Sequence, residues 1–208
     1  MDTQLSAAQH TLLWDAFRSG DRSAFAKLYE LFAADLYRYG YNLVRNRQVV
    51  EDCLHELFLH LHESHQRLGP TDNIRFYLFR ALRRRLLDTV GRMKKLDSEA
   101  YHFDNAEFLI QPHEATLVTE ELVDQQSRIV VAELNRLPKR QKEILYLVYM
   151  KGLTYPQAAE IMGITMKSVY NTVNVALASL RMCLHESLQL RGAFLSLAGL
   201  VMRYFASN

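Results

Sequence analysis

Apolar side chains recur every three or four residues along most of this chain, which is the spacing of one face of an α-helix. No stretch alternates convincingly between apolar and polar residues, as a half-buried strand would. A short amphipathic segment before residue 19 places Leu12, Leu13, Ala16 and Phe17 on one face. Further helices are predicted over residues 22–43, 49–68, 74–92, 120–137, 139–151, 155–162, 166–181 and 184–205. The sequence therefore predicts an all-α protein.

The predicted helices fall into two groups. Residues 95–119 have weak periodicity, contain Pro112 and are too long for an ordinary loop in a compact domain, so we interpret them as a linker. We expect two small helical domains, with boundaries at 1–95 for the first domain, 96–119 for the linker, 120–185 for the second domain and 186–208 for an apolar extension. The extension should pack on the second domain, cover a DNA-binding face or bind a partner helix.

Residues 153–181 predict a helix-turn-helix, in which one glycine separates two short helices. Thr154 and Gln157 can form a capping box, Gly163 permits a left-handed cap, and Thr165 can cap the second helix. The apolar positions of the second helix should pack inward, and they are Val169, Val173, Ala176, Leu177 and Leu180. The outer positions, where a recognition helix meets base edges, are Lys167, Ser168, Tyr170, Asn171 and Asn174. The alternative is an ordinary helical hairpin whose polar face is only solvated.

The 208 residues carry a net charge of only +2, yet the charges are segregated along the chain. Residues 74–95 contain many arginines and lysines and a single acid, Asp88. Residues 96–127 contain no Lys or Arg but many Asp and Glu. This segregation indicates a contact with a polyanion beside a segment that avoids or mimics it.

Composition places the chain among globular proteins, because 49% of its residues are hydrophobic, enough for real cores. Cys53 and Cys183 lie far apart without a C-x-x-C motif, which suggests a reducing compartment. The N-terminus lacks the basic start and apolar run of a signal peptide, and no apolar run approaches the ~20 residues that span a bilayer. We therefore expect a cytoplasmic protein.

Two clusters resemble reactive sites without completing one. The histidines that share a predicted helix are His55, His60, His62 and His65. The last two could share a metal ion, but no Cys or second His cluster completes a tetrahedral site, so we interpret them as surface residues. Three nearby carboxylates have no nucleophile, glycine-rich loop or metal ligands beside them, and they are Glu51, Asp52 and Glu56. We expect no catalytic residue, no metal, no cofactor and no small-molecule substrate.

Two helical modules with a basic helix and an acidic linker resemble an extracytoplasmic-function (ECF) sigma factor of bacterial RNA polymerase. The motifs that carry the resemblance, in order, are GDRSAFAKLY at 20–29, EDCLHELFLHL at 51–61, YLFRALRRRLLD at 77–88 and LPKRQKEILYLVY at 137–149. They are similar to the family's opening helix, polymerase-binding helix, promoter-melting helix and entry to the upstream-element module. The resemblance covers roughly residues 10–185, and the run at 167–177 is closest to the Bacteroidetes type.

The resemblance implies an alternative sigma factor that binds core polymerase, recognises a bipartite promoter and starts its melting. The residues that match the face gripping the clamp helices of the β′ subunit are Asp52, His55, Glu56, Phe58 and Leu61. The residues implied in binding and melting the minus-ten element are Asn73, Arg75, Tyr77, Arg80, Arg83 and Arg84, beside a loop at 66–73 that captures a flipped base. The outer residues of the recognition helix would read the minus-thirty-five element. The implied partners are core polymerase, including the flap of β, promoter DNA and a membrane-bound anti-sigma factor.

The chain also departs from the family pattern. The recognition helices of this family usually carry several basic residues, whereas this one has Tyr170, Thr172, Asn174 and Val175 at comparable places. Fewer cations mean fewer phosphate contacts and a shallower salt dependence. A stand-alone helix-turn-helix regulator and a degenerate sigma-like protein acting mainly through an anti-sigma partner stay open as alternatives. The polymerase-binding helix argues against the first, and the intact basic helix argues against the second.

Overall fold

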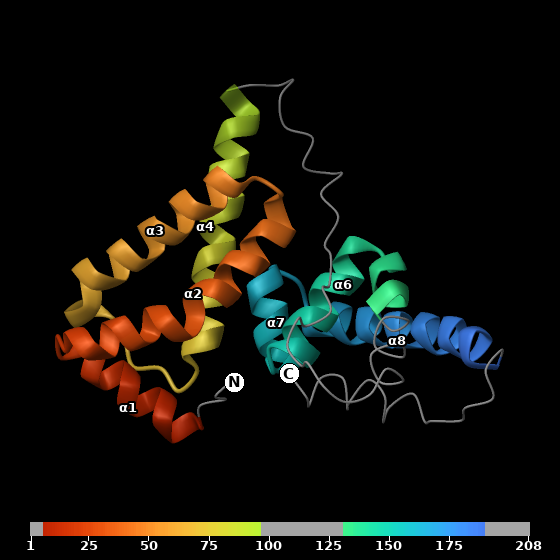
Figure 1. Cartoon of the computed structure of the whole chain (residues 1–208), viewed down its shortest axis with the longest axis horizontal. Helices are drawn as coiled ribbons and strands as arrows, with labels where there is room; N and C mark the ends of the chain where they lie inside the picture. The colour runs from red at the N-terminus through yellow and green to blue at the C-terminus, as the bar shows by residue number, and fades with distance from the viewer. Residues whose placement is uncertain (1–5, 97–130, 190–208) are drawn as a thin grey trace, which may run out of the picture. The chain divides into compact units, whose positions relative to one another are not determined.

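The computed structural model describes residues 6–96 and 131–189 (Figure 1). Every regular element in these two stretches is helical, which confirms the all-α prediction for them. The chain divides into two compact units, Met1–Glu107 and Phe108–Asn208, and each unit has its own internal packing. Nearly all of the predicted linker, the start of the predicted helix at 120–137 and most of the apolar extension lie outside the described residues.

The helices of the first unit begin where short-range signals in the sequence place them. In chain order they are α1 (Ala7–Arg18), α2 (Arg22–Val44), α3 (Arg47–Ser64), the 3-10 helix η1 (His65–Arg67) and α4 (Ile74–Leu96). The carboxylate of Asp21 accepts from the backbone N–H of Ser23 at 2.7 Å and so caps α2. The side chain of Asn46 accepts from the N–H of Val49 at 3.1 Å and caps α3. Both caps satisfy N–H groups that a helix start leaves without partners.

Helices α2, α3 and α4 pack against one another, and α1 packs against α2. Gly40 in α2 lies at their closest approach, because a Cβ there would be 3.0 Å from Val50 Cγ1 and 3.2 Å from Leu86 Cδ1. Val50 and Leu86 are both fully buried. The three helices therefore meet at a point where only the smallest residue fits without movement.

Helix α1 turns a different face inward from the one that the sequence predicts. Trp14 is fully buried and Phe17 is 2% exposed, whereas Leu12 is 71% exposed. Leu12 therefore does not share the inward apolar face that the sequence predicts for this segment, whereas Phe17 does lie on the inward face. The interior under α1 is an aromatic cluster, in which the rings of Trp14 and Phe17 lie 5.4 Å apart.

The described part of the second unit is a helix-turn-helix preceded by two shorter helical stretches. Residues 131–136 are helical, and they are followed by α6 (Lys139–Leu145), the π-helical turn η3 (Tyr146–Met150), α7 (Tyr155–Met162) and α8 (Met166–Gln189). The predicted single helix at 139–151 thus changes from α to π geometry in its second half. Helix α8 also extends beyond its predicted end at residue 181.

Local side chains and one glycine define both ends of α7 as predicted. The hydroxyl of Thr154 accepts from the N–H of Gln157 at 3.4 Å, and the side chain of Gln157 accepts from the N–H of Thr154 at 3.0 Å. This reciprocal pair confirms the capping box. Gly163 has φ +64° and forms the predicted left-handed cap of α7. In the described part of the chain, no helix is sufficiently long and apolar to span a membrane.

Candidate functional site

The first turns of α8 present the polar face predicted for a recognition helix. The hydroxyl of Thr165 accepts from the N–H of Ser168 at 3.1 Å, which fixes the start of the helix. Val169 and Val173 are 0% and 1% exposed and pack inward. Among the predicted DNA-contacting residues, those exposed to solvent are Lys167, Tyr170, Asn171 and Asn174, while Ser168 is half-buried. The outward face therefore carries an ammonium, amide and phenol groups that can bond base edges and phosphates.

Tyr170 lies at one end of a series of three tyrosines, in which Tyr155 contacts both Tyr170 and Tyr149. The ring of Tyr155, in the first turn of α7, meets the ring of Tyr170 edge-on with centroids 6.1 Å apart. Burial, followed by a hydrogen bond to Tyr155, raises the pKa of Tyr149 to about 12. The three rings link η3, α7 and α8. Their sequence separations of six and fifteen residues follow no helical period, so no sequence signal pairs them.

The predicted melting residues lie along the first half of α4. Arg80 and Arg84 are exposed, whereas Arg75 and Arg83 are half-buried. The guanidinium of Arg75 lies 5.9 Å from the centroid of the Phe32 ring, within the range of a cation–π contact. One helix thus offers several guanidinium groups to a phosphate backbone.

Asn73 and Tyr77 have structural contacts in addition to their predicted roles. The side-chain oxygen of Asn73 accepts from the N–H of Phe76 at 2.9 Å and caps α4. The ring of Tyr77 lies 5.1 Å from the ring of Trp14, and burial raises the pKa of the Tyr77 hydroxyl. Tyr77 is therefore half-buried, with its ring packed against Trp14.

The exposed face of α3 is acidic and polar. Asp52, His55 and Glu56 are all exposed, as their predicted place in a polymerase-binding face requires. The carboxylate of Glu56 lies 3.2 Å from the guanidinium of Arg85 in α4, so this ion pair joins the two helices. The half-exposed pair leaves Glu56 accessible from solvent.

Two members of the predicted polymerase-binding set, Phe58 and Leu61, lie in the interior instead. Phe58 is 4% exposed with its ring edge-on to Tyr29, and Leu61 is fully buried. Their expected place on an exposed face is wrong, because both belong to the apolar stripe of α3. Leu59 is 47% exposed and shares the face of Asp52, which lies seven residues, or two helical turns, earlier. Its position outside the apolar stripe is the signal that the sequence offered.

Comparisons with known proteins agree with this arrangement. The Sigma-70 region 2 family matches residues 28–95, and the Sigma-70, region 4 family matches residues 127–180. The ECF RNA polymerase sigma factor SigM of Bacillus subtilis (strain 168) is 26% identical over 149 residues, which cover 67% of this chain and 82% of SigM. The ECF sigma factor SigK of Mycolicibacterium vanbaalenii is 22% identical, with coverage of 79% and 83%. This chain belongs to the ECF sigma factors.

This sigma factor is therefore an alternative sigma factor for transcription initiation, with region 2 in its first unit and region 4 in its second. Two solved structures have the same fold. CnrH, in complex with the cytosolic domain of CnrY, is 18% identical with a TM-score of 0.52, and the match covers 85% of this chain and 97% of CnrH. The sigma factor RpoE of Bartonella quintana, in complex with the anti-sigma factor NepR, is 20% identical with a TM-score of 0.53 and coverage of 77% and 96%.

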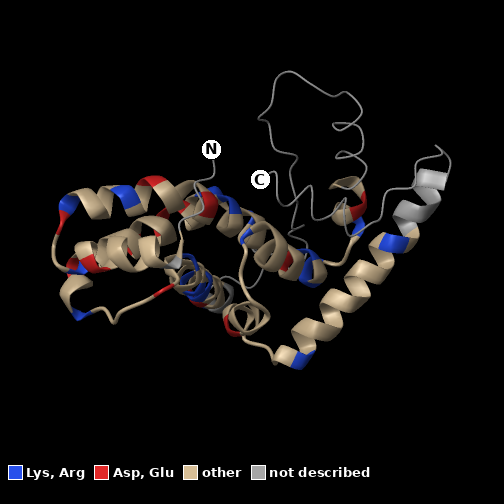
Figure 2. Ribbon diagram, turned by 90° about the horizontal axis from the view of Figure 1, so that it is seen from below, with Lys and Arg blue, Asp and Glu red and all other residues tan. Residues whose placement is uncertain are grey.

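The recognition helix of this sigma factor is poor in cations. Figure 2 shows the described part of α8 without blue over most of its length, and residues 168–180 contain no Lys or Arg. Lys167 is thus the cation at the start of the helix. The polar groups on this face are therefore mostly amides and hydroxyls, with one ammonium group at its start.

The histidines of α3 do not form a metal centre in the part of the chain that the structure describes, where no group of three or more candidate ligands is present. His62 and His65 stack with ring centroids 6.4 Å apart, and Nδ1 of His65 lies 2.7 Å from the carbonyl oxygen of His62. The ring of His62 also packs 5.2 Å from that of Phe25. These contacts assign the pair to the junction between α2, α3 and η1.

Proposed function

We propose that this sigma factor binds core RNA polymerase through the exposed face of α3, holds the melted minus-ten strand along α4 and reads the minus-thirty-five element with the start of α8. The observation that carries this proposal is one helical unit that exposes carboxylates on α3 and arginines on α4. Opposite charges on neighbouring helices suit two different partners, a protein surface and a phosphate backbone.

On the polymerase side, the proposed contact face consists of Asp52, His55, Glu56 and Leu59. It combines acidic groups, which steer encounter with a basic surface, and one exposed apolar side chain, which can be buried on binding. The polymerase supplies the chemistry, and we propose that the sigma factor performs no catalysis itself. A cytoplasmic location stays a prediction.

On the DNA side, the arginines of α4 would hold phosphates of the separated strand, while the loop at 66–73 would receive an unstacked base. Asn171 and Asn174 are suited to paired hydrogen bonds with adenine, and Lys167 and Ser168 to phosphate or base contacts. Because α8 carries few cations, upstream binding would depend on tethering by polymerase, which raises the effective concentration of the second unit.

We also propose an anti-sigma partner, since the solved structure of RpoE contains a sigma factor in complex with the anti-sigma factor NepR. Whether that partner is membrane-bound, and whether this chain is of the Bacteroidetes type, stay predictions.

The test is transcription by core polymerase from a library of candidate promoters, with and without the full chain, at two salt concentrations. Promoter-specific initiation is expected only with the chain present. Asp52→Arg should weaken polymerase binding at least tenfold, whereas Glu30→Arg, the same charge reversal on α2, should leave it unchanged. Both variants should keep the wild-type circular dichroism spectrum. Equal polymerase affinity of the two variants, or no initiation from any promoter, would refute the proposal.

The upstream contact has its own control in the DNA. Asn171→Ala should reduce initiation at a promoter with an intact minus-thirty-five element by roughly tenfold, because a paired base contact is worth about 1–3 kcal/mol. A promoter with a scrambled upstream element should respond much less to the same substitution. An equal response of both promoters would remove Asn171 from the base-reading set.

A further inference from the structure

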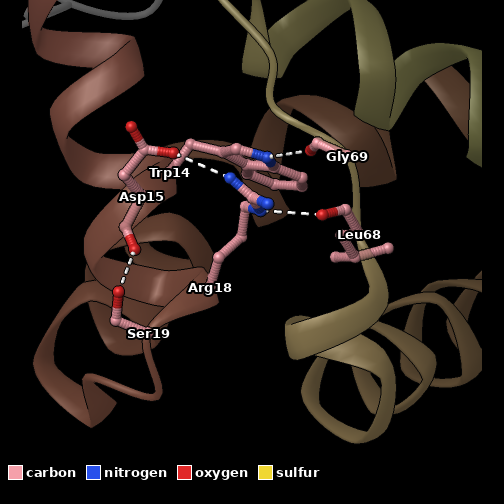
Figure 3. A network of polar contacts seen from close by, with 6 residues as sticks. All are labelled: Trp14, Asp15, Arg18, Ser19, Leu68 and Gly69. Atoms are coloured by element: carbon pink, nitrogen blue, oxygen red, sulfur yellow. Dashed lines mark hydrogen bonds and ion pairs between the residues drawn. The ribbon is translucent and has the colours of Figure 1, made fainter.

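Helix α1 ties down the loop that precedes α4, through two hydrogen bonds to consecutive backbone carbonyls (Figure 3). Nε1 of Trp14 donates to the carbonyl oxygen of Gly69 at 2.8 Å. Nε of Arg18 donates to the carbonyl oxygen of Leu68 at 2.7 Å. The two partners are fifty or more residues from their donors in sequence. The loop is therefore restrained by a helix that the sequence analysis did not connect with it.

Both donors are themselves held in place. The Trp14 side chain is fully buried, and its ring contacts Phe17 and Tyr77 with centroids 5.4 and 5.1 Å away. The guanidinium of Arg18 pairs with the carboxylate of Asp15 at 3.1 Å. Trp14 cannot follow a moving loop without losing its ring contacts, so the restraint rests on a packed indole, with the partly exposed Arg18–Asp15 pair beside it.

The loop remains accessible although its backbone is anchored. Gly69, Pro70 and Asp72 are exposed, and a Cβ at Gly69 would meet no atom within 4 Å. The far end is fixed to α4, because the side-chain oxygen of Asn73 accepts from the N–H of Phe76 at 2.9 Å, and the N–H of Asn73 donates to the hydroxyl of Thr71 at 3.2 Å. The segment is thus fixed at both ends and open in the middle, immediately before the arginines of α4.

We propose that Trp14 and Arg18 are positioning residues, which preorganise residues 68–73 to receive an unstacked base of single-stranded DNA. The inference rests on the proposed function, which assigns base capture to this loop. Extruding a base is costly, and a receptor that must also order its own backbone would bind more weakly. The indole and guanidinium remove that second cost before DNA arrives.

A structural support with no part in recognition would use the same contacts, so the test needs a readout that mere destabilisation does not change. That readout is base preference, measured on two promoters that are both premelted at minus ten. It is the rate of open-complex formation with the preferred base at the captured position, divided by the rate with another base there. Loss of folded protein lowers both rates equally and leaves their ratio unchanged. Loss of a preorganised pocket lowers the ratio itself.

The variants are Trp14→Phe, which keeps an aromatic ring but removes the donor, and Arg18→Gln, which removes the guanidinium. The matched control is Leu43→Val, which shortens a core side chain near the C-terminal end of α2. Each is tested as the full chain bound to core polymerase. The expected result is a fall of roughly fivefold in base preference for each loop variant, the size of one net hydrogen bond, with none for the control. Polymerase affinity should stay at the wild-type value.

Hydrogen exchange of the free full chain tests the restraint separately from its use. The backbone amides of Leu68, Gly69, Thr71 and Asp72 should exchange faster in both loop variants, while the control exchanges as the wild type does. Unchanged exchange, or faster exchange with an unchanged base preference, would overturn the inference while leaving the proposed function standing. Failure of the wild-type chain to initiate at any promoter would instead refute the proposed function, and the inference with it.

Discussion

Gly40→Ala tests whether the contact of α2, α3 and α4 is as tight as the geometry indicates. The new methyl would lie 3.0 Å from Val50 Cγ1 and 3.2 Å from Leu86 Cδ1, closer than ordinary carbon–carbon contact. Both neighbours are fully buried, so neither can move without displacing others.

Two opposing effects decide the magnitude. Replacing a glycine by alanine inside a helix stabilises it by up to about 1 kcal/mol, because alanine loses less backbone entropy on folding. Adding a methylene-sized group to a filled core destabilises by about 1–3 kcal/mol. We expect the second effect to prevail and Gly40→Ala to lower the free energy of unfolding of the first unit by about 1 kcal/mol. The corresponding fall in Tm is about 5 °C for a unit of this size.

The assay is urea unfolding of the full chain followed by circular dichroism, with Gly91→Ala as the matched control. Gly91 lies inside α4, and a Cβ there would meet nothing within 4 Å, so this substitution should stabilise by about 0.5–1 kcal/mol. Gly40→Ala should also cost less in a Val50→Ala background, where the nearest methyl is absent. If the two glycine substitutions stabilise equally, the reasoning about the helix contact is refuted.

Further predictions concern the second unit, pH and the ion pair. Thr154→Ala removes the N-cap of α7 and should destabilise the second unit by about 1 kcal/mol in thermal unfolding. An unchanged thermal unfolding curve would mean that water replaces the hydroxyl at the helix start. Burial and the charge of Arg75 lower the pKa of His10 below 6.5 in the folded state, so the free energy of unfolding should fall as pH drops through 6.5. His10→Gln should reduce that loss, whereas His60→Gln, a change at an exposed histidine, should not. Glu56→Gln should cost less than ~1 kcal/mol of stability, so a larger loss of polymerase affinity would report a direct contact.

Features set by neighbouring residues were predictable from the sequence. The capping box at Thr154, the left-handed Gly163 and the inward stripe of Val169 and Val173 follow from spacings of three or four residues. They were found because a helix end or a helix face is specified within one or two turns. The four exposed polar positions of α8 follow from the same periodicity, although their partners do not.

Features set by contacts between distant segments were not predictable in this way. Leu12 and Trp14 both fit an amphipathic segment, and what selects Trp14 for the interior is a carbonyl at residue 69 and the ring of Tyr77. In α3, by contrast, helical spacing alone places Phe58 in the apolar stripe and Leu59 outside it, and it was the motif match that assigned Phe58 to the binding face. Motif matching transfers positions but not orientations, and for that reason it placed two buried residues on a binding face.

Trp14 also makes the protein unusually simple to follow by spectroscopy. It is the chain's one tryptophan, and it is fully buried in the first unit. Excitation above the tyrosine absorption band therefore reports on the first unit alone, while the second unit with its tyrosines stays dark. Emission that shifts to the red before circular dichroism is lost would mean that the two regions unfold separately. The same signal would show whether an anti-sigma partner or polymerase stabilises one region without the other.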